Sequence, residues 1–183
     1  DALLLQTPES LKERYNLDVR VFTEVLSIYT VDKKVSVKNL QTGEIYLENY
    51  DKLLLSPGAE PIKPPFEGID SDKIYTLRNI PDMDKIVAKT KNAQNFVVVG
   101  GGFIGLEVAE NLIEAGKSVK LVELGNQVMA PVDFDIASFV HEKAKQKGLE
   151  LLLNVGVEKF NDKGETIEVF LNNGTSLETD AVI

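Results

Sequence analysis

The sequence predicts an α/β protein with two related units, each combining parallel strands and helices with a small antiparallel meander. Three observations support this fold class. An apolar run at 96–99 passes through a glycine-rich turn straight into a helical pattern. Residues 17–54 and 149–183 share one pattern at an offset of about 132 positions. Five of the seven prolines lie in 57–81, which is typical of a linker between the two units.

The glycine-rich turn has the spacing of a dinucleotide-binding fingerprint. Gly100 allows a tight turn off the strand, Gly102 lets the backbone approach a pyrophosphate, and Gly105 lets the helix pack closely on the strand. Glu123 ends the next apolar run, 23 positions after Gly100. Strand, glycines, helix and acid together predict a Rossmann-like unit that binds a dinucleotide at the helix N-terminus. The alternative is a glycine-rich turn without a ligand.

The remaining elements follow from periodicity and turn residues. Each copy of the repeat reads as a strand, a meander and a return strand, with polar turns at Thr42-Gly43 and Asn173-Gly174. The return strands are the apolar runs after Asp51 and Asp180. Helices are expected at 8–15, 82–91, 103–116 and 134–147, the last with Asp133 as N-cap. In the third helix, Ile104, Val108, Leu112 and Ala115 are expected to face the sheet.

Both units look truncated. The first copy has only the end of such a unit, so its own fingerprint is expected before residue 1. The second copy stops at Ile183, whereas its counterpart continues to Ala59. We therefore expect an excerpt of a longer protein that carries two dinucleotide sites.

Composition excludes several classes of function. The chain has 20 basic and 29 acidic side chains, a net charge of −9, so nucleic acid and anionic membrane are not expected partners. It has no cysteine and one histidine, so neither a disulfide framework nor a metal site is expected. No secretory signal or membrane-spanning run is visible, which predicts a cytoplasmic protein.

Four stretches resemble one known family. They are TPESLKERYN (7–16), YDKLLLSPGAEPIKPP (50–65), TLRNIPDMDKI (76–86) and VVVGGGFIGLEVAENL (97–112). The sequence is similar to FAD-dependent pyridine nucleotide–disulfide oxidoreductases across essentially the whole chain. It resembles most the branch of coenzyme A-disulfide reductases, NADH-dependent persulfide reductases, NADH oxidases and NADH peroxidases.

The resemblance implies an organisation and a reaction. Residues 1–80 would be the C-terminal part of the first segment of an FAD-binding domain, and 81–183 an NAD-binding domain truncated at its C-terminus. NADH would reduce FAD, which would reduce a small-molecule disulfide or persulfide, such as those of coenzyme A. The redox cysteine is expected upstream, so this chain holds no catalytic residue, and the complete protein is expected to be a homodimer. The alternatives are an NADH oxidase or peroxidase, and a non-catalytic dinucleotide-binding module.

The expected NAD contacts come from the turn and the strand that follows it. They are Gly100, Gly101, Gly102, Phe103, Ile104, Gly105, Glu107 and Glu123. Glu123 would accept hydrogen bonds from the adenosine ribose and favour NAD over NADP, because no Lys or Arg follows it before Lys143. The resemblance implies that Phe103 covers the flavin and that Glu107 lies near the nicotinamide amide. Helix packing, and an acid favoured by the helix dipole, are the respective alternatives.

The expected FAD contacts are Ser56, Pro57, Gly58 and Ala59, together with the backbone of Val25, all by resemblance. A plain turn is the alternative for 56–59. Arg14 and Lys12 match positions where relatives contact coenzyme A phosphates, although a solvated helix face explains them equally well. His141 lies in the helix at 134–147 without a partner constellation and is expected to be structural or exposed.

Overall fold

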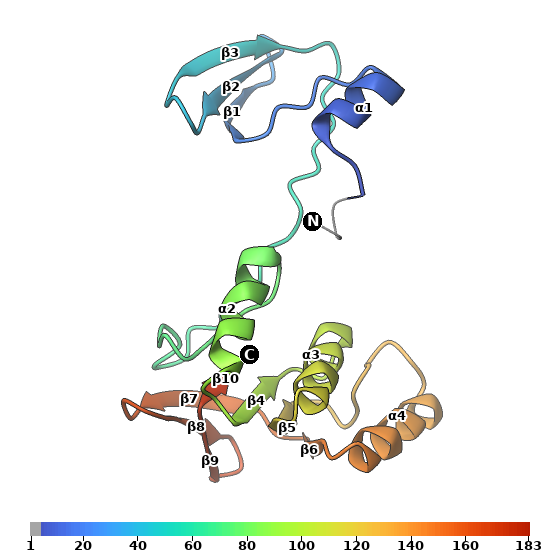
Figure 1. Ribbon diagram of the computed structural model, residues 1–183, viewed down its shortest axis with the longest axis vertical. Helices are drawn as coiled ribbons and strands as arrows, with labels where there is room; N and C mark the ends of the chain where they lie inside the picture. The colour runs from blue at the N-terminus through green and yellow to red at the C-terminus, as the bar shows by residue number, and fades with distance from the viewer. Residues whose placement is uncertain (1–4) are drawn as a thin grey trace. The chain divides into compact units, whose positions relative to one another are not determined.

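The computed structural model describes residues 5–183, which form two compact units divided after Gly58 (Figure 1). Each unit is mixed in secondary structure, as the sequence predicts. No helix in the described part of the chain is long and apolar enough to cross a bilayer.

The first unit contains one helix and one meander. Helix α1 (Pro8–Tyr15) begins at a capping box, in which the Thr7 hydroxyl accepts from the Ser10 N–H at 3.2 Å and Pro8 occupies the first turn. Strands β1 (Thr23–Tyr29), β2 (Lys34–Asn39) and β3 (Ile45–Asn49) form an antiparallel sheet in that order.

The second unit is built around a parallel sheet with strand order β10-β4-β5-β6. Its elements are α2 (Ile80–Thr90), β4 (Asn95–Val99), α3 (Phe103–Glu114), β5 (Ser118–Glu123), α4 (Phe134–Gln146), β6 (Glu150–Leu153), β7 (Val157–Asp162), β8 (Ile167–Leu171), β9 (Ser176–Thr179) and β10 (Ala181–Val182). The chain runs from β4 through β5 to β6 and returns to the other side of β4 as β10. The strand order therefore reverses between β4 and β10, where open α/β sheets bind ligands.

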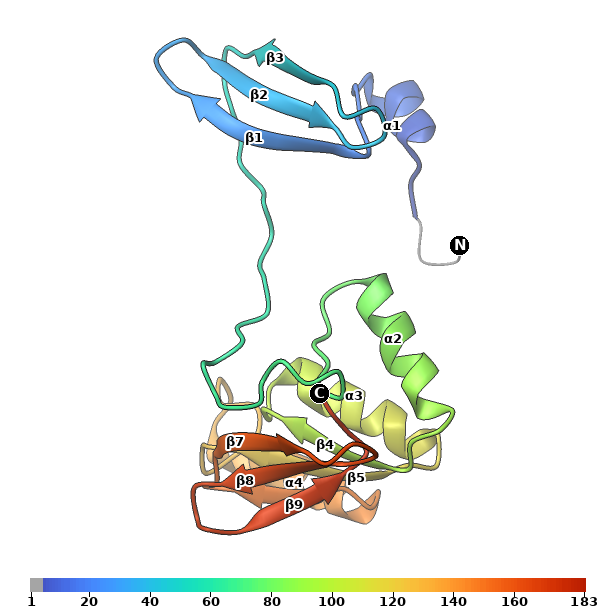
Figure 2. The same cartoon turned by 90° about the vertical axis from the view of Figure 1, so that its left-hand side faces the viewer.

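Both faces of the parallel sheet are covered, which explains why its strands are mostly apolar. Phe96, Val98 and Leu121 point to the side of the helices and join a core with Leu112 of α3. Alternate residues, Val97, Val122 and Val182, point to the other side, where they pack on the β7–β8–β9 meander (Figure 2). This two-sided core fixes β4 beneath the N-terminus of α3.

The internal repeat is present in the backbone. Strand β1 has a register irregularity between Val25 and Ser27 against β2. Strand β7 has its irregularity between Val157 and Lys159 against β8, at the same offset of about 132 positions. Both meanders are antiparallel with neighbouring strands in chain order. The two copies therefore share a bulge as well as a sequence pattern.

One expected strand of the first copy is absent. The apolar run after Asp51 forms no strand, and Leu54 and Leu55 are 89% and 62% exposed. Its counterpart β10 pairs in parallel with β4, Ala181 opposite Phe96. Among the described residues, no parallel strand is available to pair with the run after Asp51. Because a strand needs a hydrogen-bonding neighbour, the prediction fails at this position.

Residues 59–79 belong to the second compact unit rather than to the first. Glu67 bridges in parallel to Lys159, and Ile74 to Val182. The compact units thus divide about 20 residues before the boundary near residue 80 that the resemblance implies between FAD and NAD domains. That boundary concerns the complete family fold and stays a prediction.

The predicted helices are present with shifted ends. Helix α2 begins at Ile80 rather than 82, because the Asn79 side chain accepts from the Asp82 N–H at 2.9 Å and caps the helix. Asp133 occupies the N-cap position of α4 as expected, although its side chain makes no capping hydrogen bond.

Candidate functional site

The glycine turn between β4 and α3 is held tightly against the sheet. Gly100 has φ +104° and donates its N–H to the Val122 carbonyl at 2.8 Å. A Cβ at Gly105 would lie 2.0 Å from the Gly100 carbonyl oxygen, well inside van der Waals contact. Glycine at 105 therefore allows the first turn of α3 to lie directly on the turn that precedes it.

The N-terminus of α3 presents free backbone donors. Gly102 is the N-cap and has no side chain to cap the helix. The first helical hydrogen bond is from the Leu106 N–H to the Gly102 carbonyl at 3.0 Å. Among the described residues, the N–H groups of 102–105 have no acceptor. Four free donors at the positive end of a helix dipole form an anion site.

The space in front of these donors is open. A Cβ built on Gly102 would meet no atom within 4 Å. A hollow of about 570 Å³ adjoins the turn, and Val99, Gly100, Gly102, Phe103 and Ile183 contribute to its lining. It lies at the carboxyl ends of β4 and β10, where the strand order reverses. The free donors, the open space and the hollow together fit the backbone of a dinucleotide.

The carboxylate of Glu123 holds the loops on either side of the turn. One oxygen accepts the Gly101 N–H at 2.6 Å, and the other accepts the Gly125 N–H at 2.6 Å. The side chain is half-buried at the end of β5, next to the glycine turn. Because each carboxylate oxygen can accept more than one hydrogen bond, both can still receive ribose hydroxyls.

Two residues at the start of α3 lie outside the core. Phe103 is 56% exposed and Ile104 is 61% exposed, and both line the hollow of about 570 Å³. Ile104 was expected to face the sheet with Val108 and Leu112, which are buried. It is exposed instead, because it borders this hollow. Ala115, expected in the same stripe, is also exposed, past the C-terminus of α3.

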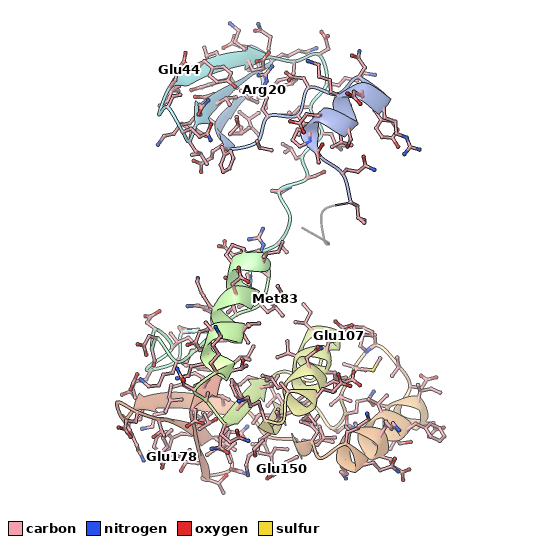
Figure 3. The ribbon with its side chains drawn as sticks, in the orientation of Figure 1. Arg20, Glu44, Met83, Glu107, Glu150 and Glu178 are labelled. Atoms are coloured by element: carbon pink, nitrogen blue, oxygen red, sulfur yellow. The ribbon has the colours of Figure 1, made fainter. Side chains whose placement is uncertain are left out.

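Glu107 lies on α3, one turn into the helix (Figure 3). It lines a second hollow of about 870 Å³ between α2 and α3, together with Met83 of α2. The structure therefore places Glu107 close in sequence to the free donors but on the side of α3 that faces α2. Its expected contact with the nicotinamide amide stays a prediction.

The residues expected to contact FAD belong mainly to the other unit. Val25 lies in β1 and pairs with Val37. Ser56, Pro57, Gly58 and Ala59 form no helix or strand. The Arg14 guanidinium lies 5.1 Å from the centre of the Tyr15 ring. The contacts of these residues with FAD or coenzyme A stay predictions.

His141 contacts the loop that follows Glu123, a contact that could not be predicted from the sequence. Its Nε2 accepts the Val128 N–H at 3.1 Å. Burial lowers the pKa of His141, and the nearby charge of Lys145 lowers it further. The imidazole is therefore neutral at neutral pH, the form in which Nε2 can accept a hydrogen bond.

Residues 3–183 match the family model described as pyridine nucleotide-disulphide oxidoreductase. The chain belongs to the pyridine nucleotide-disulphide oxidoreductase family. A coenzyme A disulfide reductase from Staphylococcus haemolyticus is 36% identical over 158 residues, 85% of this chain and 35% of the relative. The chain spans about two fifths of the length of the curated relatives it matches.

Solved structures of the oxidoreductase family share the fold. The reduced form of CoADR-RHD from Bacillus anthracis has a TM-score of 0.92 at 44% identity, and the match covers 100% of this chain and 33% of that one. A water-forming NADH oxidase from Lactobacillus brevis, bound to NADH, has a TM-score of 0.91 at 31% identity, with 100% and 40% covered. An engineered form of that oxidase, bound to NADPH, carries five substitutions that remove one aspartate and add two arginines.

Proposed function

We propose that this chain is part of a flavin-dependent NADH oxidoreductase, in which it holds NADH and aligns it for hydride transfer to FAD. The electrons then pass to a disulfide or persulfide such as those of coenzyme A. One observation carries the proposal: four free amides at the N-terminus of α3 face open space beside Glu123, at the point where the strand order reverses.

The residues of the turn would bind and orient the cofactor. The amides of 102–105 would hold the pyrophosphate, and Glu123 would accept the adenosine ribose hydroxyls. NADH supplies a hydride, and a flavin accepts it as two electrons and a proton. Those two electrons, that proton and one further proton convert one disulfide into two thiols. The chain's contribution is therefore alignment, with Phe103 at the edge of the hollow as the residue that would cover the flavin.

Glu123 supports NADH rather than NADPH as the electron donor. A 2′-phosphate on the adenosine ribose would meet the carboxylate that accepts from Gly101 and Gly125, and the two negative charges would repel. No Lys or Arg lies between Glu123 and Lys143 to neutralise that charge. The engineered NADPH oxidase, with an aspartate removed and arginines added, changes charge in the direction this argument requires.

A second candidate is an NADH oxidase that reduces oxygen. The L. brevis water-forming NADH oxidase, with its TM-score of 0.91, favours it as directly as the S. haemolyticus relative favours disulfide reduction. A non-catalytic dinucleotide-binding module is the candidate from another class. We further propose a homodimeric, cytoplasmic full-length protein, on the resemblance to the branch of disulfide reductases and NADH oxidases.

The test is an anaerobic titration of the purified full-length protein with NADH and with NADPH. The flavin absorbance is monitored during each titration. NADH is expected to bleach the flavin at lower concentration than NADPH. Coenzyme A disulfide, a persulfide, peroxide and oxygen are then added in turn, and the compound that restores the absorbance fastest is the acceptor. A protein without flavin absorbance would overturn the FAD assignment, and preference for NADPH would overturn the role of Glu123.

A further inference from the structure

We propose that His141 is a positioning residue for the dinucleotide site, whose neutral imidazole holds the loop 124–132 against the glycine turn and releases it in acid. This inference rests on the proposed function, because it concerns the same dinucleotide site. It adds a residue on a different helix, and a dependence on pH, to the contacts made by the turn itself.

A short series of contacts joins His141 to the turn. Its Nε2 accepts the Val128 N–H at 3.1 Å. Val128 is fully buried, and its Cγ1 would lie 2.8 Å from a Cβ built on Gly101. The Val128 side chain therefore lies directly on the second glycine of the turn. Moving Val128 would remove this support from Gly101, which precedes the free donors in the chain.

The residue after Val128 completes the link. The Met129 N–H donates to the Gly101 carbonyl at 2.7 Å. Met129 has φ +53°, a left-handed conformation that costs a side chain such as methionine free energy and persists only where its surroundings enforce it. Gly101 in turn donates its N–H to Glu123. The bond from His141 to Val128 is thus one of the contacts that hold this conformation in place.

The contact requires a neutral imidazole. A protonated ring carries a hydrogen on Nε2, which would point at the Val128 N–H and could not accept from it. The loop 124–132 carries no ionisable side chain that could stabilise the charged ring. The charged groups near the ring in sequence are Asp133, where the loop ends, and Asp135, Glu142, Lys143 and Lys145 on α4; of these, Lys145 acts against protonation.

The direction of the pH effect follows from this geometry. Burial and Lys145 lower the pKa of His141 below its ordinary value of 6.5. The hydrogen bond from the Val128 N–H to His141 is therefore fully formed above pH 6.5. It is lost in acid, as the pH falls past the lowered pKa that His141 has in the folded protein. Dinucleotide binding should weaken over the same interval.

Two substitutions separate the acceptor from the titration. In His141→Gln, the amide oxygen can reach the position of Nε2, so the acceptor is retained and the titrating group is removed. In His141→Phe, a ring of similar size can keep the edge contact with Phe134, whose ring centre lies 6.3 Å from that of His141, but the acceptor is lost. Neither substitution touches the donors of 102–105.

The experiment measures ADP-ribose binding to the flavin-loaded full-length protein by calorimetry between pH 8 and pH 5. The unaltered protein is expected to bind less tightly as pH falls, whereas His141→Gln keeps its pH 8 affinity further into acid. His141→Phe should bind about three- to tenfold more weakly at pH 8, the effect of losing one hydrogen bond. Amide hydrogen exchange in 124–132 without ligand should be faster in His141→Phe than in His141→Gln at one pH.

The outcomes keep the two proposals apart. Failure of the unaltered protein to bind ADP-ribose at any pH would refute the proposed function. If ADP-ribose binds, equal affinity and exchange in His141→Phe and the unaltered protein would refute the role of His141. The same acid weakening in His141→Gln as in the unaltered protein would assign the titration to another group and overturn the inference.

Discussion

Serine substitutions at Gly102 and Gly105 should have opposite effects on binding and stability. Gly102 has φ −73° and open space in front of it, whereas a Cβ at Gly105 would lie 2.0 Å from the Gly100 carbonyl oxygen. Both residues are glycines of the same turn, three positions apart. The pair therefore distinguishes a glycine required by a ligand from a glycine required by the fold.

The structure gives the size of each effect. Serine is a favoured N-cap residue, so Gly102→Ser should change the free energy of unfolding by no more than about 0.5 kcal/mol. Its side chain would fill the space expected for the pyrophosphate and displace at least two charge-assisted hydrogen bonds, about 3–6 kcal/mol or more than about 100-fold in affinity. Gly105→Ser overlaps backbone and should cost about 1–3 kcal/mol of stability, reduced by about 0.5 kcal/mol through better helix propensity.

Urea unfolding followed by circular dichroism gives the stability of each variant, and calorimetry gives its affinity for ADP-ribose. Gly102→Ser should unfold at the same urea concentration as the unaltered protein but should not bind ADP-ribose. Gly105→Ser should unfold at a lower urea concentration. Unchanged ADP-ribose affinity in Gly102→Ser would show that the pyrophosphate lies elsewhere. Unchanged stability in Gly105→Ser would show that α3 can move away from the turn without cost.

Three further substitutions test the charge, the core and the linker contacts of the second unit. Glu123→Gln places an amide NH₂ against one of two N–H donors and removes the charge that repels a 2′-phosphate, so the preference for NADH over NADPH should fall about tenfold in flavin-reduction titrations. Leu121→Ala empties a fully buried position and should cost about 2–5 kcal/mol in urea unfolding, while the folded fraction still binds ADP-ribose. Asp162→Asn removes a carboxylate whose pKa is held far below its usual range, first by Lys73 at 2.8 Å. Its stabilisation is complete above the ordinary value of 3.8 and is lost in stronger acid, so the difference in melting temperature between Asp162→Asn and the unaltered protein should be greatest at pH 7 and shrink at low pH.

The glycine turn could be predicted from sequence because its chemistry is local. Gly100, Gly102 and Gly105 lie within six residues, and the strand and helix on either side follow from periodicity. Glu123 needs only one further step, because the carboxyl end of the next parallel strand lies beside the turn. The repeat likewise predicts the two antiparallel meanders, because both copies share the same alternation and the same kind of polar turn.

Contacts across the fold could not be predicted in this way. Lys73 and Asp162 are 89 positions apart, and nothing in either neighbourhood identifies the other as its partner. His141 has no polar neighbours that point to a role, because its partner is a backbone N–H, which every residue except proline provides. Ile104 has the periodicity of a core residue but borders an open hollow and is exposed.

The two copies of the repeat show what decides whether an apolar run becomes a strand. Asp51-Lys52-Leu53-Leu54 and Asp180-Ala181-Val182-Ile183 have the same pattern of one acid and an apolar run. Ala181 and Val182 form β10 because Phe96 and Val97 offer a parallel edge, and both residues are buried there. Leu53 and Leu54 have no such edge among the described residues and remain exposed. Apolar character supplies the driving force for burial, but the backbone adopts a strand only where another strand can accept and donate its hydrogen bonds.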